Sequence, residues 1–199
     1  MRAAAASLRP AEMVRTRAFG LMYVVAVLVT FGGLLVTAQL KPMAVSAGLD
    51  GTSLPGGMGM NTLTIALMAN LAVGALARPF WGWLSDRMGR YEAMILSFGL
   101  GGAAIVGLIY GLRSPFWFVG LSTLTIFAWG SSFVLFSAAV GDAFGSDYAA
   151  TNTGIQYTSK GVAAIFAGWG AARLLELTES WIPVLWLAAG CNFAAAALV

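Results

Sequence analysis

A single lysine interrupts the apolar segment Thr151-Asn-Thr-Gly-Ile-Gln-Tyr-Thr-Ser-Lys160-Gly-Val-Ala-Ala-Ile-Phe-Ala-Gly168, which otherwise has the composition of a membrane-spanning helix. No other charge lies between residues 152 and 172, so Lys160 is about eight residues, or ~12 Å along a helix, inside the segment. The apolar core of a bilayer is about 30 Å thick, and an ammonium group near its middle costs at least ~2.5 kcal/mol. A cost of this size usually marks a binding site or an ion pathway.

Polar side chains of this segment recur at the i, i+3, i+4, i+7 spacing that places residues on one helix face. They are Thr153, Gln156, Tyr157 and Lys160. The opposite face consists of alanine, valine, isoleucine and phenylalanine. We therefore expect the polar face to meet water or substrate and the apolar face to meet protein or lipid.

The composition of the whole chain is that of an integral membrane protein. Hydrophobic residues make up 59% and charged residues 10% of it, whereas a soluble domain carries about 25% charge. Histidine, the commonest general base and metal ligand, is absent, and the single cysteine, Cys191, lies in an apolar run that favours a packing role. The net charge of +3 comes from basic residues at the ends of apolar runs, so we predict neither a nucleic-acid partner nor a metal or other cofactor.

Six apolar runs predict six transmembrane helices in an all-α membrane protein. Their expected ranges are 18–40, 60–84, 93–112, 115–140, 152–175 and 181–199. Lys41 and Pro42 are expected to end the first helix, and a glycine-rich loop with Pro55 separates it from the second. Residues 1–17 are polar and basic, so the chain divides into this segment and a transmembrane bundle over residues 18–199.

Lysine and arginine residues set the expected orientation, because they accumulate on the cytoplasmic side of a membrane protein. One side of the predicted bundle carries six of them: Arg2, Arg9, Arg15, Arg17, Arg87 and Arg90. The other side carries three: Lys41, Arg113 and Arg173. We therefore predict a multi-pass protein of the inner (plasma) membrane with both termini in the cytoplasm. The lack of a cytoplasmic tail after the sixth helix suggests that the chain is cut short there.

A short charged connection joins the second and third predicted helices, with the sequence Gly82-Trp-Leu-Ser-Asp86-Arg87-Met-Gly89-Arg90. Gly89 permits the sharp reversal that two antiparallel helices need. Asp86 can accept hydrogen bonds at a helix N-terminus or pair with Arg87 or Arg90. The stretch is therefore either a positively charged anchor at the cytoplasmic surface or a latch that holds one conformation.

This stretch resembles the G-x-L-a-D-r-x-G-r signature of the major facilitator superfamily, which joins the second and third helices of each six-helix half. The segment from Gln156 to Gly168 resembles the penultimate helix of the oxalate/formate antiporter family. Arg78 matches the arginine in that family's eighth helix, and Gln39-Leu-Lys-Pro42 also fits its bacterial members. The resemblance covers nearly the whole chain, as helices seven to twelve of twelve.

The resemblance implies the C-terminal half of a transporter, with residues 1–17 as the remnant of the central cytoplasmic loop and an N-terminal six-helix half as partner. In the family, carboxylates bind between the halves, held by the arginine and the lysine within a box of aromatic side chains. The expected substrate-binding residues are Arg78, Trp129, Phe133, Gln156, Tyr157 and Lys160. Phe133 lacks a hydroxyl that the family pattern leads us to expect, and Tyr157 replaces an expected tryptophan, which leaves the exact substrate open.

The two intramembrane cations support an anion site independently of the resemblance. Arg78 precedes the charged turn by about eight residues, and Lys160 follows the start of its helix by about nine. Both are therefore ~12 Å from the same membrane face, and no acidic residue lies within a predicted span. Snorkelling to the lipid headgroups, or deprotonation in the case of Lys160, is an alternative, as is ordinary packing for the aromatic residues.

No arrangement of residues indicates an enzyme. The sequence has no intramembrane aspartate pair, no H-E-x-x-H motif and no cysteine–histidine set, and Ser159 and Lys160 point about 100° apart on a helix. We therefore predict a secondary transporter that exchanges small carboxylate anions of the oxalate/formate type by alternating access. The alternatives are a transporter of another small mono- or dicarboxylate and a membrane scaffold or channel fragment that transports nothing.

Overall fold

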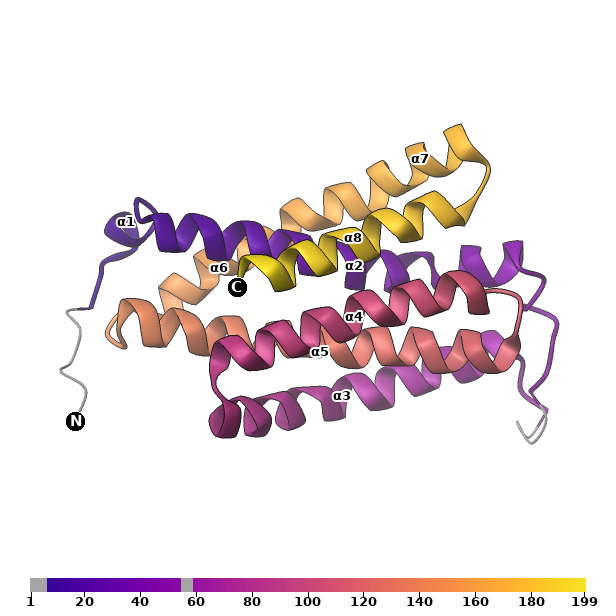
Figure 1. Ribbon diagram of the computed structural model, residues 1–199, viewed down its shortest axis with the longest axis horizontal. Helices are drawn as coiled ribbons and strands as arrows, with labels where there is room; N and C mark the ends of the chain where they lie inside the picture. Colours follow the sequence, from indigo (N-terminus) through magenta and orange to yellow (C-terminus); the bar gives the residue numbers. More distant parts are fainter. Residues whose placement is uncertain (1–6, 55–58) are drawn as a thin grey trace.

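The computed structural model describes residues 7–54 and 59–199, and its long elements are all helices (Figure 1). The helices are α1 (Pro10–Met13), α2 (Arg17–Ser46), α3 (Thr62–Met88), α4 (Arg90–Gly111), α5 (Pro115–Phe144), α6 (Ala149–Ile165), α7 (Ala171–Thr178) and α8 (Trp181–Leu198). A π-helical turn, η1 (Phe166–Gly170), joins α6 to α7. Arg2 and Pro55, which contribute to the sequence predictions, lie outside the described residues.

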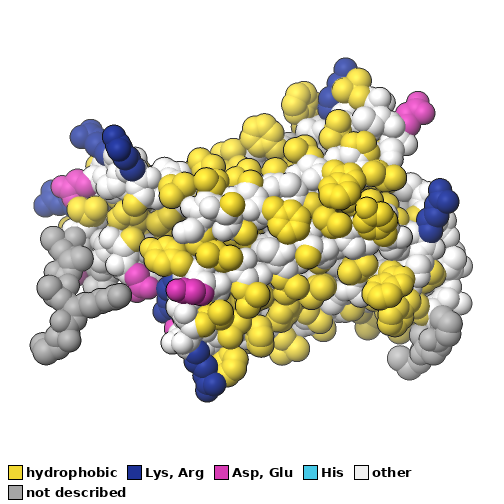
Figure 2. Space-filling model, viewed as in Figure 1, with side chains coloured by type: hydrophobic (Ala, Val, Ile, Leu, Met, Phe, Trp, Pro, Cys, Tyr) yellow, Lys and Arg dark blue, Asp and Glu magenta, His cyan; other side chains and the backbone are white. Residues whose placement is uncertain are grey.

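Within the described residues, five helices are long and apolar enough to cross a membrane: α2, α3, α4, α5 and α8. The predicted span over residues 152–175 is built from three parts, because α6, η1 and α7 follow one another without a break. Charged side chains gather towards the ends of the molecule, and hydrophobic side chains cover the band between them (Figure 2). The predicted all-α, multi-pass membrane architecture is confirmed, and the helices are consistent with one half of a major facilitator superfamily fold.

The bundle has two ends, which we name after the turns that they carry. The α3–α4 end carries Gly89, the C-terminus of α5 and the N-termini of α2 and α6. The α4–α5 end carries residues 112–114, the C-terminus of α2 and the N-terminus of α3. Helices α3 and α5 therefore run in the same direction, from the α4–α5 end towards the α3–α4 end.

Helix α5 lies at the centre of the bundle and packs against α2, α3, α4 and α6. Helix α8 packs against α2 and α4, and α6 packs mainly against α2. Helix α3 packs chiefly against α5 and is the least buried of the five long helices, so one of its sides is uncovered. Large apolar side chains on α3, such as those of Leu71 and Leu76, are exposed there. The candidate site lies beside α3 and α5.

Helix α2 is longer than the sequence predicts. The sequence places its end near Lys41 and Pro42, whereas the helix continues to Ser46. A proline inside a helix removes a backbone hydrogen bond, but the buried side chains of Met43 and Ala44 hold the last turn of α2 against the bundle. The expected end of the helix is therefore wrong, because packing outweighs the local effect of the proline.

The segment before α2 packs against the α3–α4 end of the bundle. The backbone N–H of Leu8 donates to the Phe144 carbonyl at 2.9 Å, and Asn152 Nδ2 donates to the Leu8 carbonyl at 3.2 Å. Met13 of α1 is fully buried in a cluster that includes Phe144. These contacts fix the start of α6, the helix that carries Lys160.

Candidate functional site

Small residues bring α3 close to α5 and thereby place Arg78 beside α5. Gly130 of α5 lies against Ala77 of α3, and a Cβ atom added at Gly130 would be only 2.6 Å from the Ala77 Cβ atom. Arg78 follows Ala77 directly in the chain, and its Cζ atom lies 4.5 Å from the centre of the Phe133 ring. The close helix contact thus sets the guanidinium of α3 against an aromatic side chain of α5.

Lys160 of α6 reaches the same ring from a different helix. Its Nζ atom lies 3.3 Å from the centre of the Phe133 ring and 3.9 Å from the centre of the Tyr157 ring. Helix α5 holds Tyr157 in turn, because the tyrosine hydroxyl donates to the Phe133 carbonyl at 2.7 Å. The tyrosine hydroxyl also forms a hydrogen bond with the Ser137 hydroxyl at 2.8 Å. The structure therefore brings both predicted cations onto one phenylalanine.

The aromatic residues predicted to surround the substrate are also brought together. The Trp129 and Phe133 ring centres are 5.4 Å apart, and those of Phe133 and Tyr157 are 6.5 Å apart, both with edge-to-face geometry. Trp129 packs on Gly33 of α2, where a Cβ atom would overlap the indole ring. The three rings thus form a continuous aromatic contact from α5 to α6, with its Trp129 end packed on α2.

Hydrogen-bond donors at this site lack acceptors. Among residues 7–54 and 59–199, neither the buried Nζ of Lys160 nor the buried Nε1 of Trp129 has a hydrogen-bond partner. The ion pairs within these residues involve Arg90 and Arg173, and not Arg78 or Lys160. Burying an unpaired cation is costly, and two cations beside one ring repel each other. This set of donors fits a small anion and does not fit a metal cation.

A cavity of about 480 Å³ opens between α2, α3 and α5, and Arg78 lies in its wall. Trp129 and Phe133 also line it, together with apolar side chains from all three helices. The other polar side chains in its lining are those of Thr37 and Asn70. Lys160 is not part of this lining, but it contacts the cavity wall through the Phe133 ring. The arrangement can therefore hold an anion at Arg78, with Lys160 adding positive charge to the aromatic wall.

Gln156, which the sequence places among the expected substrate contacts, faces a different helix. Its side chain is completely buried, and its Nε2 atom donates to the Met22 carbonyl of α2 at 3.0 Å. Helix α6 contacts both α2 and α5, so its polar face meets two neighbours. Tyr157 and Lys160 contact α5, whereas Gln156 links α6 to α2.

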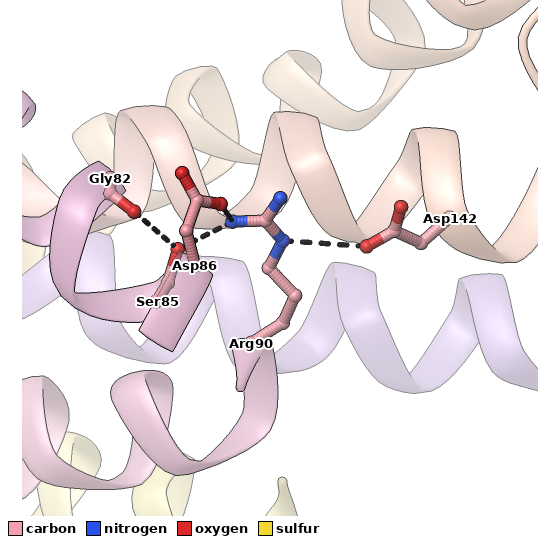
Figure 3. A network of polar contacts seen from close by, with 5 residues as sticks. All are labelled: Gly82, Ser85, Asp86, Arg90 and Asp142. Carbon is pink, nitrogen blue, oxygen red and sulfur yellow. Dashed lines mark hydrogen bonds and ion pairs between the residues drawn. The ribbon is translucent and has the colours of Figure 1, made fainter. Parts of the chain in front are cut away.

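The charged turn forms a network of polar contacts at the α3–α4 end (Figure 3). Arg90 Nη1 donates to the Asp86 carboxylate at 2.6 Å and to the Ser85 hydroxyl. Arg90 Nε donates to the Asp142 carboxylate at 3.4 Å, and the Ser85 hydroxyl donates to the Gly82 carbonyl at 2.9 Å. Because Asp142 belongs to α5, the network ties the α3–α4 turn to α5 (Figure 3).

Arg87 and Gly89 make separate contributions to this turn. Arg87 is not paired with Asp86, and its Cζ atom instead lies 4.3 Å from the centre of the Trp83 ring. Gly89 has a φ of 110°, in the region that favours glycine, and a Cβ atom there would overlap the Glu92 carboxylate. Of the two arginines that the sequence offers to Asp86, the structure selects Arg90, and Gly89 makes the reversal.

Three polar residues of these sites are missing from the sequence predictions: Asn70, Ser137 and Asp142. Asn70 and Ser137 are uncharged polar residues inside apolar helices, and a search of the spans for such residues, beyond the charged ones, would have found them. Asp142 lies beyond residue 140, where the sequence predicts that the helix ends, whereas α5 continues to Phe144.

A curated protein matches nearly the whole of this chain in sequence. No family model matches the chain. The chain is similar to the oxalate:formate antiporter of Oxalobacter formigenes, with 33% identity over 189 residues. The match covers 94% of this chain and 43% of that protein, so the chain spans less than half the length of the curated relative that it matches.

Proposed function

The chain belongs to the oxalate/formate antiporter family, and on this basis we propose that it forms one six-helix half of a secondary transporter that exchanges small carboxylate anions. One observation carries the proposal above all others. Arg78 and Lys160 lie against the same Phe133 ring, and no ion pair within the described residues neutralises either of them. A carboxylate supplies the missing negative charge.

The two cations have different roles in this proposal because their chemistry differs. The planar guanidinium of Arg78 binds one carboxylate through two parallel hydrogen bonds, as a lysine cannot. The ammonium of Lys160 acts as a point charge for the second carboxylate of a small dicarboxylate, or for monocarboxylates in turn. Trp129, Phe133 and Tyr157 limit the size of the anion and exclude water from it.

A second six-helix half completes the site in this proposal. Alternating access requires two walls that rock about one binding site, and this chain supplies one of them. The exposed apolar side chains of α3, which include those of Leu71 and Leu76, suit contact with an N-terminal half. In this proposal the protein lies in the inner (plasma) membrane. Its α3–α4 end faces the cytoplasm, because that end carries more arginine residues than the other end does.

A transporter of a different small mono- or dicarboxylate is the second candidate. The Tyr157 hydroxyl is engaged by Ser137 and the Phe133 carbonyl, and Phe133 itself has no hydroxyl. The aromatic wall therefore presents rings without a free hydroxyl donor, which favours compact anions that need only Arg78, Lys160 and the indole N–H of Trp129.

Competition between substrates in proteoliposomes tests the proposal. The complete transporter is reconstituted into vesicles loaded with unlabelled oxalate, and uptake of labelled oxalate is measured against formate, malonate, acetate and succinate. We expect saturable counterflow that small carboxylates inhibit more strongly than succinate. Counterflow selective for another carboxylate favours the second candidate, and no counterflow with any carboxylate overturns the proposed function.

A further inference from the structure

The cavity beside Arg78 extends along the bundle, and contacts between α3 and α5 give its depth. Asn70 of α3 pairs with Thr123 of α5, and eight residues further along α3, Arg78 contacts Phe133. Asn70 therefore lies about 12 Å closer to the α4–α5 end than Arg78, measured along the helix axis. Asn70, Arg78 and Phe133 all line the same cavity. The cavity thus has a polar group near each end of its length.

Asn70 presents a hydrogen-bond donor in the part of the cavity nearer to the α4–α5 end. The Thr123 hydroxyl donates to Asn70 Oδ1 at 2.9 Å, and this bond fixes the orientation of the amide group. Within residues 7–54 and 59–199, no hydrogen bond engages Asn70 Nδ2. Another polar residue of the cavity lining, Thr37, uses its hydroxyl proton to donate to the Gly33 carbonyl at 2.8 Å. Within the described part of the chain, the Asn70 amide is therefore an available neutral donor of the cavity lining, in addition to the indole N–H of Trp129.

We propose that Asn70 forms a first binding site for small carboxylate anions, which accept a hydrogen bond from its amide before they reach Arg78. We call this site, which lies nearer to the α4–α5 end than Arg78 does, the outer station. The proposal rests on the proposed function, since it names a second contact on the path of the same substrate. A neutral amide binds a carboxylate less strongly than a guanidinium does, so the anion moves on to Arg78. The bond from Thr123 polarises the amide and strengthens its N–H donors.

Because the outer station lies on one side of Arg78, it predicts different effects on transport from the two sides of the membrane. Removing the Asn70 amide weakens capture of anions that come from the α4–α5 side, and leaves capture from the α3–α4 side unchanged. A purely structural role for the Asn70–Thr123 hydrogen bond predicts something different. In that case, loss of either partner has the same effect, and both sides of the membrane are affected alike.

The test compares Asn70→Leu with Thr123→Val in the complete transporter, in right-side-out and inside-out vesicles. Thr123→Val removes the bond between the helices but keeps the amide. For oxalate supplied on the α4–α5 side, we expect Asn70→Leu to raise the half-saturating concentration about tenfold, the typical value of a hydrogen bond to a charged group. On the α3–α4 side we expect less than about a twofold change, and Thr123→Val should stay within about threefold of the parent on both sides.

Each possible result decides for or against the station. Equal changes on the two sides, no change in Asn70→Leu, or equal effects of the two variants overturn it while the transport function stands. No counterflow by the parent overturns the proposed function and the station together. If Asn70→Leu does not reach the membrane, Asn70→Ser replaces it with the same expected asymmetry, because serine is too short to take the amide's place.

Discussion

The ammonium nitrogen of Lys160 lies 3.3 Å from the centre of the Phe133 ring. The guanidinium carbon of Arg78 lies 4.5 Å from the same centre, so two positive groups share one aromatic side chain. A cation–π contact contributes about 2 kcal/mol when it is desolvated, which is less than the cost of several kcal/mol for burying an unpaired cation. The site without substrate is therefore electrostatically unfavourable, and an anion between the two groups relieves the repulsion.

Neutralising either cation should abolish transport. In Arg78→Gln and in Lys160→Gln, one carboxylate of a bound dicarboxylate loses its partner, and such a loss in a buried pair costs about 3–5 kcal/mol. That cost corresponds to a roughly hundredfold or larger loss of affinity. Oxalate counterflow, normalised to the amount of transporter in the membrane, measures the effect.

Arg78→Lys is the control for the identity of the charge. It should recover little transport, because lysine cannot make the two-pronged contact of a guanidinium. If Arg78 only snorkels to the headgroups, Arg78→Lys is nearly silent. Counterflow within a few-fold of the parent in both neutral variants would falsify the paired-cation site.

Replacing Phe133 should weaken substrate binding less than removing a cation does. Phe133→Leu removes the ring that both cations contact, and two contacts of about 0.5–1 kcal/mol each predict a roughly tenfold rise in the half-saturating oxalate concentration. Phe133→Tyr keeps the ring and should stay close to the parent. Equal behaviour of the leucine and tyrosine variants would show that the ring does not position the cations.

Gly130 should be far more sensitive to substitution than Gly120 on the same helix. A Cβ atom at Gly130 meets Ala77 of α3, whereas one at Gly120 has nothing within 4 Å. Gly130→Ala is expected to destabilise the protein by about 1–3 kcal/mol, and Gly120→Ala to be neutral or up to about 1 kcal/mol stabilising. Thermal unfolding of the two variants in detergent compares them, and an equal melting temperature contradicts the close contact between α3 and α5.

Cysteine labelling should reveal opposite sides of the membrane at the two ends of the bundle. In a Cys191→Ala background, Ser53→Cys at the α4–α5 end should react with an impermeant maleimide added outside intact cells. Met88→Cys and Ser146→Cys at the α3–α4 end should react only after the membrane is opened. All three positions are exposed in the structure, so access by the reagent reports the side of the membrane. The reverse pattern overturns the proposed orientation.

The sequence predicts the all-α membrane architecture and the convergence of the two cations, because apolar runs and charges within them are visible in a single sequence. Apolar runs of about 20 residues are recognisable as spans in a single sequence. A charge in such a run is costly, so Arg78 and Lys160 stand out and their equal depth can be counted along the helices.

The features that sequence analysis misses depend on contacts between helices. Pro42 reads as a helix end in isolation, yet buried neighbours in α2 carry the helix past it. Gln156 reads as part of the substrate face, yet it bonds to the α2 backbone because α6 contacts two helices at once. Asp142 joins Arg90 only through the packing of the α3–α4 turn on α5. None of these pairings leaves a periodic signal in the sequence.

The π-helical turn η1 changes the repeat length of the span that contains Lys160. Ala163, Ala167 and Ala171 are all buried, at successive steps of four residues. In a regular α-helix each such step rotates a side chain by about 40°, and the strip would drift away from the buried face of the span. The wider turn absorbs this rotation, so the three alanines stay buried from α6 through η1 to the start of α7. A helical wheel drawn at 3.6 residues per turn will therefore misassign the faces of α7, and a relative with a regular helix here should align with a one-residue gap near η1.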